Sequence, residues 1–119
     1  MKERIKSDEL FSGNAVTVVN FWFTTCSPCV DELSELDALN KELSGKGGSL
    51  IGINSFTLDG DEAAISEAKA VLKKKDASYR NVYFDSDSEA GKFIENVYAY
   101  PTTYVVDRSG SIVALPIST

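Results

Sequence analysis

The sequence contains no histidine, and this absence excludes several kinds of active site. None of its 119 residues is histidine. Pairs of cysteine and histidine, triads of serine, histidine and aspartate, and histidine-ligated metal centres therefore cannot be built from this chain alone. Two cysteines are also too few for a four-thiolate zinc site unless two chains share it. We therefore assign no metal ligand.

Positive charge and long apolar runs are also scarce. The chain has twelve lysine and arginine residues and eighteen aspartate and glutamate residues, which gives a net charge of −6. It has no basic stripe with interleaved aromatic residues, so we expect no nucleic-acid partner. No apolar stretch approaches the roughly 20 residues that span a bilayer. Residues 1–6 are charged and no apolar segment follows them. We expect a natural cytoplasmic start or a flexible end of a trimmed protein, not a signal peptide.

A chain of this length is expected to fold as a single domain over residues 1–119. The order β-α-β-α-β-α-β-β predicts an α/β sheet with helices on both faces. Residues 1–14 are expected to form a short helix or turn. The expected strands cover residues 16–23, 50–53, 82–84, 102–106 and 111–115. The expected helices cover residues 28–43, 61–75 and 86–98, the last opening on a capping-box pattern at Ser86–Glu89.

The only two cysteines, Cys26 and Cys29, directly follow the apolar run at residues 16–23. This spacing, where a strand passes into a helix, is typical of a reversible dithiol. A helix N-terminus favours an anion, so we expect Cys26 to be the exposed, attacking thiolate. Cys29 would resolve the mixed disulfide, and Pro28 fits the first helical turn. The alternatives are a metal site and a structural disulfide, which stabilises poorly when it closes so short a loop.

Two separated segments together resemble thioredoxin-fold proteins. Residues 18–29 read VVNFWFTTCSPC and resemble the active-site strand and helix start of that fold. Residues 100–110 read YPTTYVVDRSG and resemble the segment with its cis-proline and the following hairpin. Both segments are most similar to the TlpA/ResA-like branch of redoxin domains, a branch of extracytoplasmic thiol-disulfide oxidoreductases. The resemblance covers residues 7–117. The resemblance implies a thioredoxin-like α/β fold, a central mixed β-sheet flanked by helices, here expected to be truncated before the family's C-terminal helix.

The resemblance also implies roles for individual residues. Cys26 matches the nucleophile and Cys29 the resolving cysteine, with no cofactor other than the redox-active disulfide. Pro101 matches the cis-proline that faces the dithiol, where the backbone of Tyr100 would pair with a substrate strand. The alternative for Pro101 is a proline at the first position of a strand. The other residues expected to bind substrate are Thr25, Ser27 and Pro28.

Glu32 matches a glutamate that, in this branch, influences the protonation of the cysteines. A helix places residues three apart on one face, so Glu32 is expected to accept the proton of Cys29. The alternative is an ordinary first-turn acid like the neighbouring Asp31. Asn20 stands where thioredoxin has a buried aspartate, and an amide cannot titrate, which gives Glu32 more weight. Trp22 is expected in the core rather than over the site.

The function implied by this resemblance is the reduction of disulfides in client or partner proteins. The electrons for this reduction would come from an upstream thiol electron donor. The full-length protein is then expected to be extracytoplasmic and membrane-anchored, with a homodimer formed through the sheet face left by the missing helix. One alternative is a binding or structural module with a static disulfide. A weaker one is a peroxiredoxin-like peroxide reductase, whose motif is broken by Phe23. Thr25 replaces the tryptophan usual in the family, which removes an aromatic group from the expected substrate surface.

Overall fold

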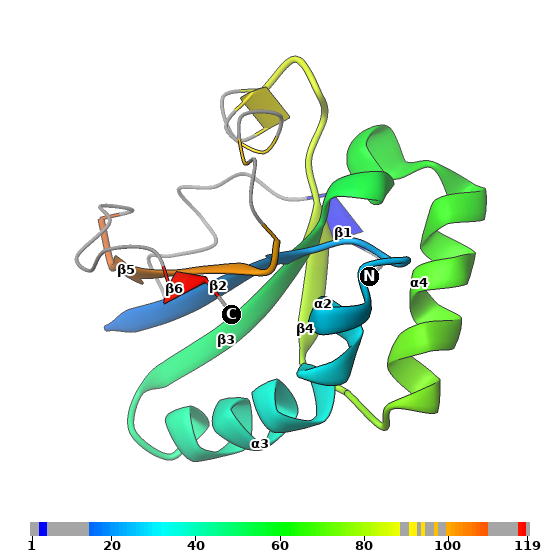
Figure 1. Cartoon of the computed structure of the whole chain (residues 1–119). Coiled ribbons are helices and arrows are strands. Elements are labelled where there is room, and N and C mark those ends of the chain that lie inside the picture. The colour runs from blue at the N-terminus through cyan, green and yellow to red at the C-terminus, as the bar shows by residue number, and fades with distance from the viewer. Residues whose placement is uncertain are drawn as a thin grey trace.

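Strands and helices alternate to build a mixed α/β fold, as the sequence predicts (Figure 1). The structure, a computed structural model, describes residues 3–4, 15–88, 91–92, 94, 97, 100–109 and 117–118. Its strands are β1 (Glu3–Arg4), β2 (Val16–Trp22), β3 (Gly48–Asn54), β4 (Arg80–Tyr83), β5 (Thr102–Asp107) and β6 (Ile117–Ser118). Its helices are α2 (Ser27–Asp31), α3 (Leu33–Ser44) and α4 (Glu62–Lys74), with the 3₁₀ segment η1 (Ser55–Gly60) before α4.

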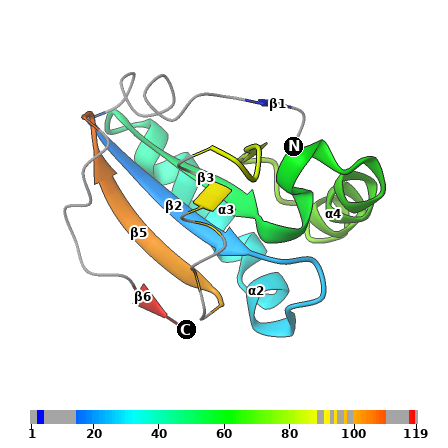
Figure 2. The ribbon, with the colours of Figure 1, turned by 90° about the horizontal axis from the view of Figure 1, so that it is seen from above.

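The strand β2 lies inside the sheet, and this position explains its apolar sequence. The strands are ordered β1-β4-β3-β2-β5-β6. β2 pairs in parallel with β3 and antiparallel with β5, which Figure 2 shows alongside it. Every residue of β2 after Val16 is buried. A strand covered on both faces is expected to read as a nearly continuous apolar run.

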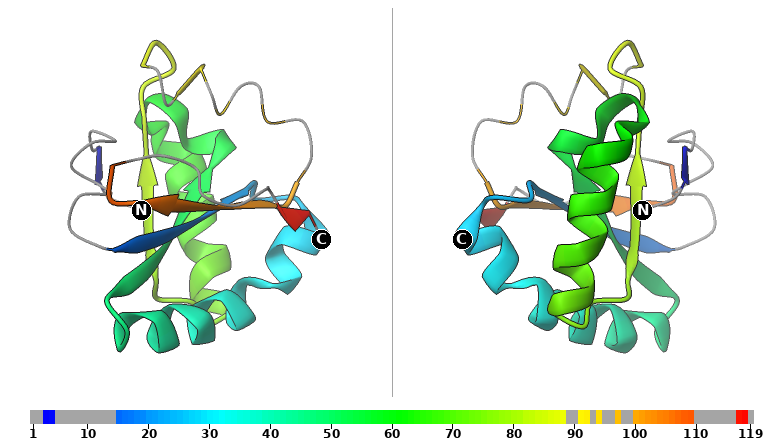
Figure 3. Two further views of the ribbon diagram at one scale, coloured as in Figure 1. Left: turned by 90° about the vertical axis from the view of Figure 1, so that its left-hand side faces the viewer. Right: turned by 90° about the vertical axis from the view of Figure 1, so that its right-hand side faces the viewer.

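Helices cover both faces of the sheet, as expected. The helical positions 91, 92 and 94 lie on the face opposite α3 (Figures 1 and 3). There Ile94 packs against the strand residues Val19, Phe21 and Ile51. α2, α3 and α4 together cover the other face. The buried residues on that face, which we call the cysteine-side core, are Val18, Trp22, Cys26, Cys29, Leu33, Leu50, Ala68, Leu72 and Tyr79.

The helix expected over residues 28–43 is interrupted at Glu32, which corrects the prediction. The N–H of Glu32 donates to the carbonyl of Cys29, only three residues back, at 3.3 Å. This 3₁₀ closure ends α2, and α3 begins where Leu36 N–H donates to the carbonyl of Glu32 at 2.9 Å. The side chain of Glu32 is bonded to a strand residue, Asn20. Helical periodicity carries no information about such a contact.

The expectations at the two chain ends are only partly testable. Within residues 1–14, Glu3–Arg4 form β1, which pairs in parallel with β4, rather than part of a helix or turn. Backbone pairing to a sheet edge outweighs the weak local preference of so short a segment. The rest of that segment lies outside the described residues, as does the strand expected at 111–115. β6 pairs antiparallel with the start of β5.

The helical turn expected over residues 86–98 begins later than its capping pattern suggests. Ser88, not Ser86, is the cap, because its Oγ accepts the N–H of Gly91 at 2.9 Å. The N–H of Ser86 instead donates to Oδ1 of Asp59 at 2.8 Å, which ties this turn to η1. Several positions of the expected helix lie outside the described residues.

A buried aspartate fastens the turn between α4 and β4 to α3. Oδ1 of Asp37 accepts the N–H groups of Ser78 at 2.8 Å and Tyr79 at 3.0 Å. Its Oδ2 pairs with Lys41 at 3.2 Å. Burial raises the pKa of the Asp37 carboxyl, but the hydrogen bond from Ser78 and the charge of Lys41 outweigh burial, and the pKa lies below its usual value. Because Tyr79 belongs to the cysteine-side core, Asp37 supports the region around the dithiol.

We expect Asp37→Ala to lower the free energy of unfolding by about 1–3 kcal/mol near neutral pH, because two backbone N–H groups lose their acceptor. The pKa of Asp37 is lower in the folded than in the unfolded state. Its carboxylate therefore stabilises fully above the unfolded value of about 3.9, and this contribution is lost as the pH falls through the folded value. Urea unfolding should show the difference between parent and variant shrinking in acid. A difference independent of pH would contradict this account.

Candidate redox site

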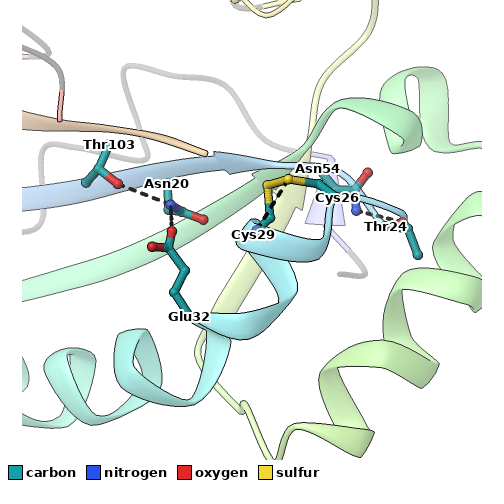
Figure 4. The surroundings of a disulfide bond; sticks show 7 residues. All are labelled: Asn20, Thr24, Cys26, Cys29, Glu32, Asn54 and Thr103. Carbon is teal, nitrogen blue, oxygen red and sulfur yellow. Dashed lines mark hydrogen bonds between the residues drawn. A yellow bond between two sulfur atoms is a disulfide. The ribbon is translucent and has the colours of Figure 1, made fainter. Parts of the chain in front are cut away.

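The two cysteines lie where β2 ends and α2 begins, and they form a disulfide (Figure 4). A turn closed by Cys26 N–H and the carbonyl of Phe23, at 3.1 Å, leads from the strand to the helix. Cys26 is the N-cap of α2, and its Sγ accepts the N–H of Cys29 at 3.3 Å. Pro28 lies in the first turn, as predicted. The sulfur of Cys26 thus lies against a backbone donor that can stabilise a thiolate.

Both cysteines are buried, which corrects the expectation of an exposed Cys26. The exposed fraction is 6% for Cys26 and 0% for Cys29. The physical reason is that the side chains of Phe23 and Tyr100 pack against the core that holds both cysteines. The expected order of accessibility still holds, since Cys26 is the less buried of the two.

The peptide bond between Tyr100 and Pro101 is cis, as predicted. Pro101 is buried and directly precedes β5, while Tyr100 is half-buried and packs against the cysteine-side core. The structure therefore brings the predicted docking segment to the side chains around the dithiol. A direct contact between Pro101 and the two sulfur atoms stays a prediction.

A cavity of about 330 Å³, lined by both polar and apolar side chains, lies beside Cys26. Of the residues predicted to bind substrate there, Thr25 and Ser27 line it, whereas Pro28 is exposed but not part of the lining. The loop before Cys26, helix α2 and the C-terminal end of α4 form its walls. The remaining lining residues are Thr24, Val30, Asp31, Val71, Lys74 and Lys75. The cavity thus combines hydroxyl groups with one carboxylate and two ammonium groups.

Glu32 is held by a buried amide on β2. Nδ2 of Asn20 donates to Oε1 of Glu32 and to Oγ1 of Thr103, both at 3.1 Å (Figure 4). Asn20 is fully buried and Glu32 half-buried, whereas Asp31 is exposed, as expected of an ordinary surface acid. The sequence predicted Glu32 but not its partners. The available signal was a lone amide inside the apolar run at residues 16–23.

Tyr79 adds a buried hydroxyl group that sequence reasoning missed. Within the described part of the chain, this hydroxyl has no hydrogen-bond partner. Burial raises the pKa of Tyr79, and the negative charges of Glu32 and Asp37 raise it further. The phenol therefore stays neutral at physiological pH and adds no charge to the core around the cysteines.

Trp22 anchors the end of β2 in the core, as predicted. It is fully buried, and its Nε1 donates to Oδ1 of Asn81 at 3.0 Å. Asn81 in turn donates to the carbonyl of Tyr79 at 3.3 Å. Gly52 on β3 leaves room for this amide, because a Cβ at that position would overlap it. The strand end that leads to Cys26 is therefore fixed to β4.

The sheet, the helix that starts at a cysteine pair and the cis-proline opposite define a thioredoxin-like domain with a dithiol/disulfide centre. The chain belongs to the AhpC/TSA family, whose sequence profile matches residues 2–115. The resemblance to thioredoxin-fold redoxin domains is thereby confirmed. Among the described residues, no helix has the length and apolar character needed to cross a membrane.

Similarity to individual proteins agrees with this assignment. The chain is 26% identical over 86% of its length to thioredoxin-like protein YneN of Bacillus subtilis, and 31% identical over 87% to thiol-disulfide oxidoreductase ResA of Bacillus thuringiensis. It spans about half of these relatives, 56% and 54%.

Solved structures show the same fold. The thioredoxin domain of a thiol-disulfide oxidoreductase from Bacteroides vulgatus superposes with a TM-score of 0.72 at 23% identity, covering 93% of this chain and 75% of that one. A thiol:disulfide interchange protein DsbE from Chlorobium tepidum gives a TM-score of 0.66 at 25% identity, covering 88% and 67%.

Glu32→Gln is expected to change the pH dependence of thiol alkylation in the reduced protein. The carboxylate that Asn20 holds lies three residues after Cys29, and the prediction is that it takes up the proton of Cys29, which an amide could not do. Iodoacetamide labelling followed by mass spectrometry over about pH 5 to 9 measures the effect. Asp31→Asn, which removes the adjacent exposed acid, is the matched control and should leave the curve unchanged. Superimposable curves for Glu32→Gln and the parent would show that Glu32 does not influence the reactivity of the dithiol.

Proposed function

We propose that this chain is a thiol-disulfide oxidoreductase that reduces disulfides in client or partner proteins. The observation that carries the proposal is Sγ of Cys26 at the N-cap of α2, where it accepts the N–H of Cys29. An acceptor at this position is stabilised as an anion, which a nucleophilic thiolate requires. Relatives named thiol-disulfide oxidoreductase and thiol:disulfide interchange protein support the same activity.

The proposed cycle begins from the reduced dithiol. The Cys26 thiolate attacks one sulfur of the client disulfide, so that a mixed disulfide forms and the other client sulfur leaves as a thiolate, which takes a proton from water. Cys29, after giving its proton to Glu32, attacks Sγ of Cys26 and releases the second client thiolate. Two electrons have then passed to the client, and the chain is in the disulfide state that the structure describes.

The proposal also names the partners of each half-cycle. The client segment binds against Tyr100 and Pro101, with Thr25, Ser27 and Pro28 along its path. An upstream thiol electron donor, itself a dithiol, returns Cys26 and Cys29 to the reduced state, so that no further cofactor is required. By resemblance to the TlpA/ResA-like branch, we infer that the full-length protein is anchored to a membrane and that this domain acts outside the cytoplasm.

Insulin reduction under dithiothreitol tests the activity and the two cysteine roles. The parent should accelerate the precipitation of insulin chains, and Cys26→Ser should reduce the rate to that of dithiothreitol alone, because the nucleophile is lost. Cys29→Ser should accumulate a mixed disulfide with the client, visible as an added mass on the protein. Accumulation in Cys26→Ser instead would reverse the roles. No acceleration by the parent would favour the static disulfide.

The homodimer expected from the sequence stays a prediction. The expectation is a dimer contact, or a terminal segment of the chain, on the sheet face beside residues 61–75 and not near Cys26. Light scattering of the whole chain measures the dimer directly, and the reactivity of Cys26 should be unchanged. A single-chain mass over the whole concentration range, with no terminal segment covering that face, would contradict the expectation.

A further inference from the structure

Three aromatic side chains form a connected surface next to the dithiol, which we call the aromatic cluster: Phe23, Phe56 and Tyr100. The ring of Phe23 lies 5.2 Å from that of Phe56, tilted by 38°, and 5.2 Å from that of Tyr100, edge to face at 79°. These separations are those of interacting aromatic pairs. The cluster thus joins the end of β2, the segment η1 and the residue before the cis bond.

Phe56 stands out within the cluster because it is exposed. Its exposed fraction is 47%, and the only other exposed large hydrophobic residue in the described part of the chain is Leu39, at 37%. Single exposed apolar residues are ordinary in soluble proteins. The exposure of Phe56 therefore needs a second observation before it indicates a function.

The second observation is that the backbone of Phe56 is fixed by a buried amide. Oδ1 of Asn54 accepts the N–H of Phe56 at 2.8 Å, and Nδ2 of the same residue donates to Oγ1 of Thr24 at 3.0 Å. Thr57 donates its hydroxyl to the carbonyl of Asn54 at 2.9 Å. Figure 4 shows the hydrogen bond between Asn54 and Thr24 in the surroundings of the disulfide. One side chain thus fixes the exposed phenylalanine and the loop that leads to Cys26.

The rest of the cluster is tied to the reacting sulfur. The carbonyl of Phe23 accepts the N–H of Cys26, and the side chains of Phe23 and Tyr100 pack against the core that contains both cysteines. A client disulfide engaged by Cys26 therefore brings its neighbouring residues to the cluster. The three aromatic rings offer apolar surface, whereas the separate cavity lined by Thr25 and Ser27 also carries the charged groups of Asp31, Lys74 and Lys75.

We propose that Phe56, together with Phe23 and Tyr100, selects clients that carry an aromatic or large aliphatic side chain beside their disulfide. This inference rests on the proposed disulfide reduction and adds a substrate class to it. Burial of the client side chain against the exposed ring supplies the binding free energy, because apolar surface leaves water on both partners. The chemistry at Cys26 is unchanged, so the selectivity enters through binding of the client.

The test compares three disulfides in single-turnover reduction by the pre-reduced protein. Two are peptides of equal length and charge, one with phenylalanine and one with serine next to the cysteine, and the third is hydroxyethyl disulfide. We expect the parent to reduce the phenylalanine peptide about fivefold faster than the serine peptide at low concentration, and Phe56→Ala to abolish most of this ratio. Phe56→Leu, which keeps apolar bulk, should retain most of it. Leu39→Ala, the control at the other exposed hydrophobic residue, should leave it unchanged.

The outcomes separate this inference from the proposed function. If the parent reduces none of the three disulfides, the proposed function fails. If it reduces all three without preferring the phenylalanine peptide, the function stands and the inference is wrong. If Phe56→Ala slows all three by the same factor, Phe56 supports the dithiol rather than client binding, which also overturns the inference. Saturation curves should place the loss in KM for the phenylalanine peptide rather than in kcat.

Discussion

The hydrogen bonds of three buried asparagine side chains hold the region around the dithiol, and of their polar atoms Oδ1 of Asn20 is without a partner among the described residues. Asn20, Asn54 and Asn81 are each at most 2% exposed and lie on three adjacent strands. Leaving such a group unpaired costs about 1–3 kcal/mol, so each amide fixes the segment that it contacts. They hold the carboxylate of Glu32, the threonine two residues before Cys26, and the indole at the end of β2. The loop with the dithiol is therefore positioned from inside the sheet.

The features that the sequence predicted correctly are those carried by local chemistry. The apolar run before the cysteines and the proline in the first helical turn each determine the conformation of their own segment. For that reason β2 and the N-cap position of Cys26 agree with expectation. The cis bond before Pro101 agrees as well, but it was expected from the resemblance to thioredoxin-fold proteins. The order of strands and helices follows from the same local patterns, since each element buries its own apolar face.

The features that the sequence did not predict depend on contacts between distant segments. Asn20 bonds to a threonine 83 positions later, and Asn54 to one 30 positions earlier. Neither separation leaves a periodic signal. The interruption of the helix at Glu32 belongs to the same class, because its side chain is bonded to a strand. Phe56 gives no comparable signal, because it lies in a 3₁₀ segment without hydrophobic periodicity.

The two surfaces beside Cys26 differ in how strongly they can discriminate between clients. In the cavity beside Cys26, the negative charge of Asp31 offsets part of the positive charge of Lys74 and Lys75, and the cavity is open to solvent that screens charges over about 10 Å. Charged client residues therefore gain little there, as is usual for exposed ion pairs. Apolar contact with the aromatic cluster is not screened by salt and grows with the area buried. This physical asymmetry between the two surfaces favours the aromatic cluster as the one that distinguishes clients.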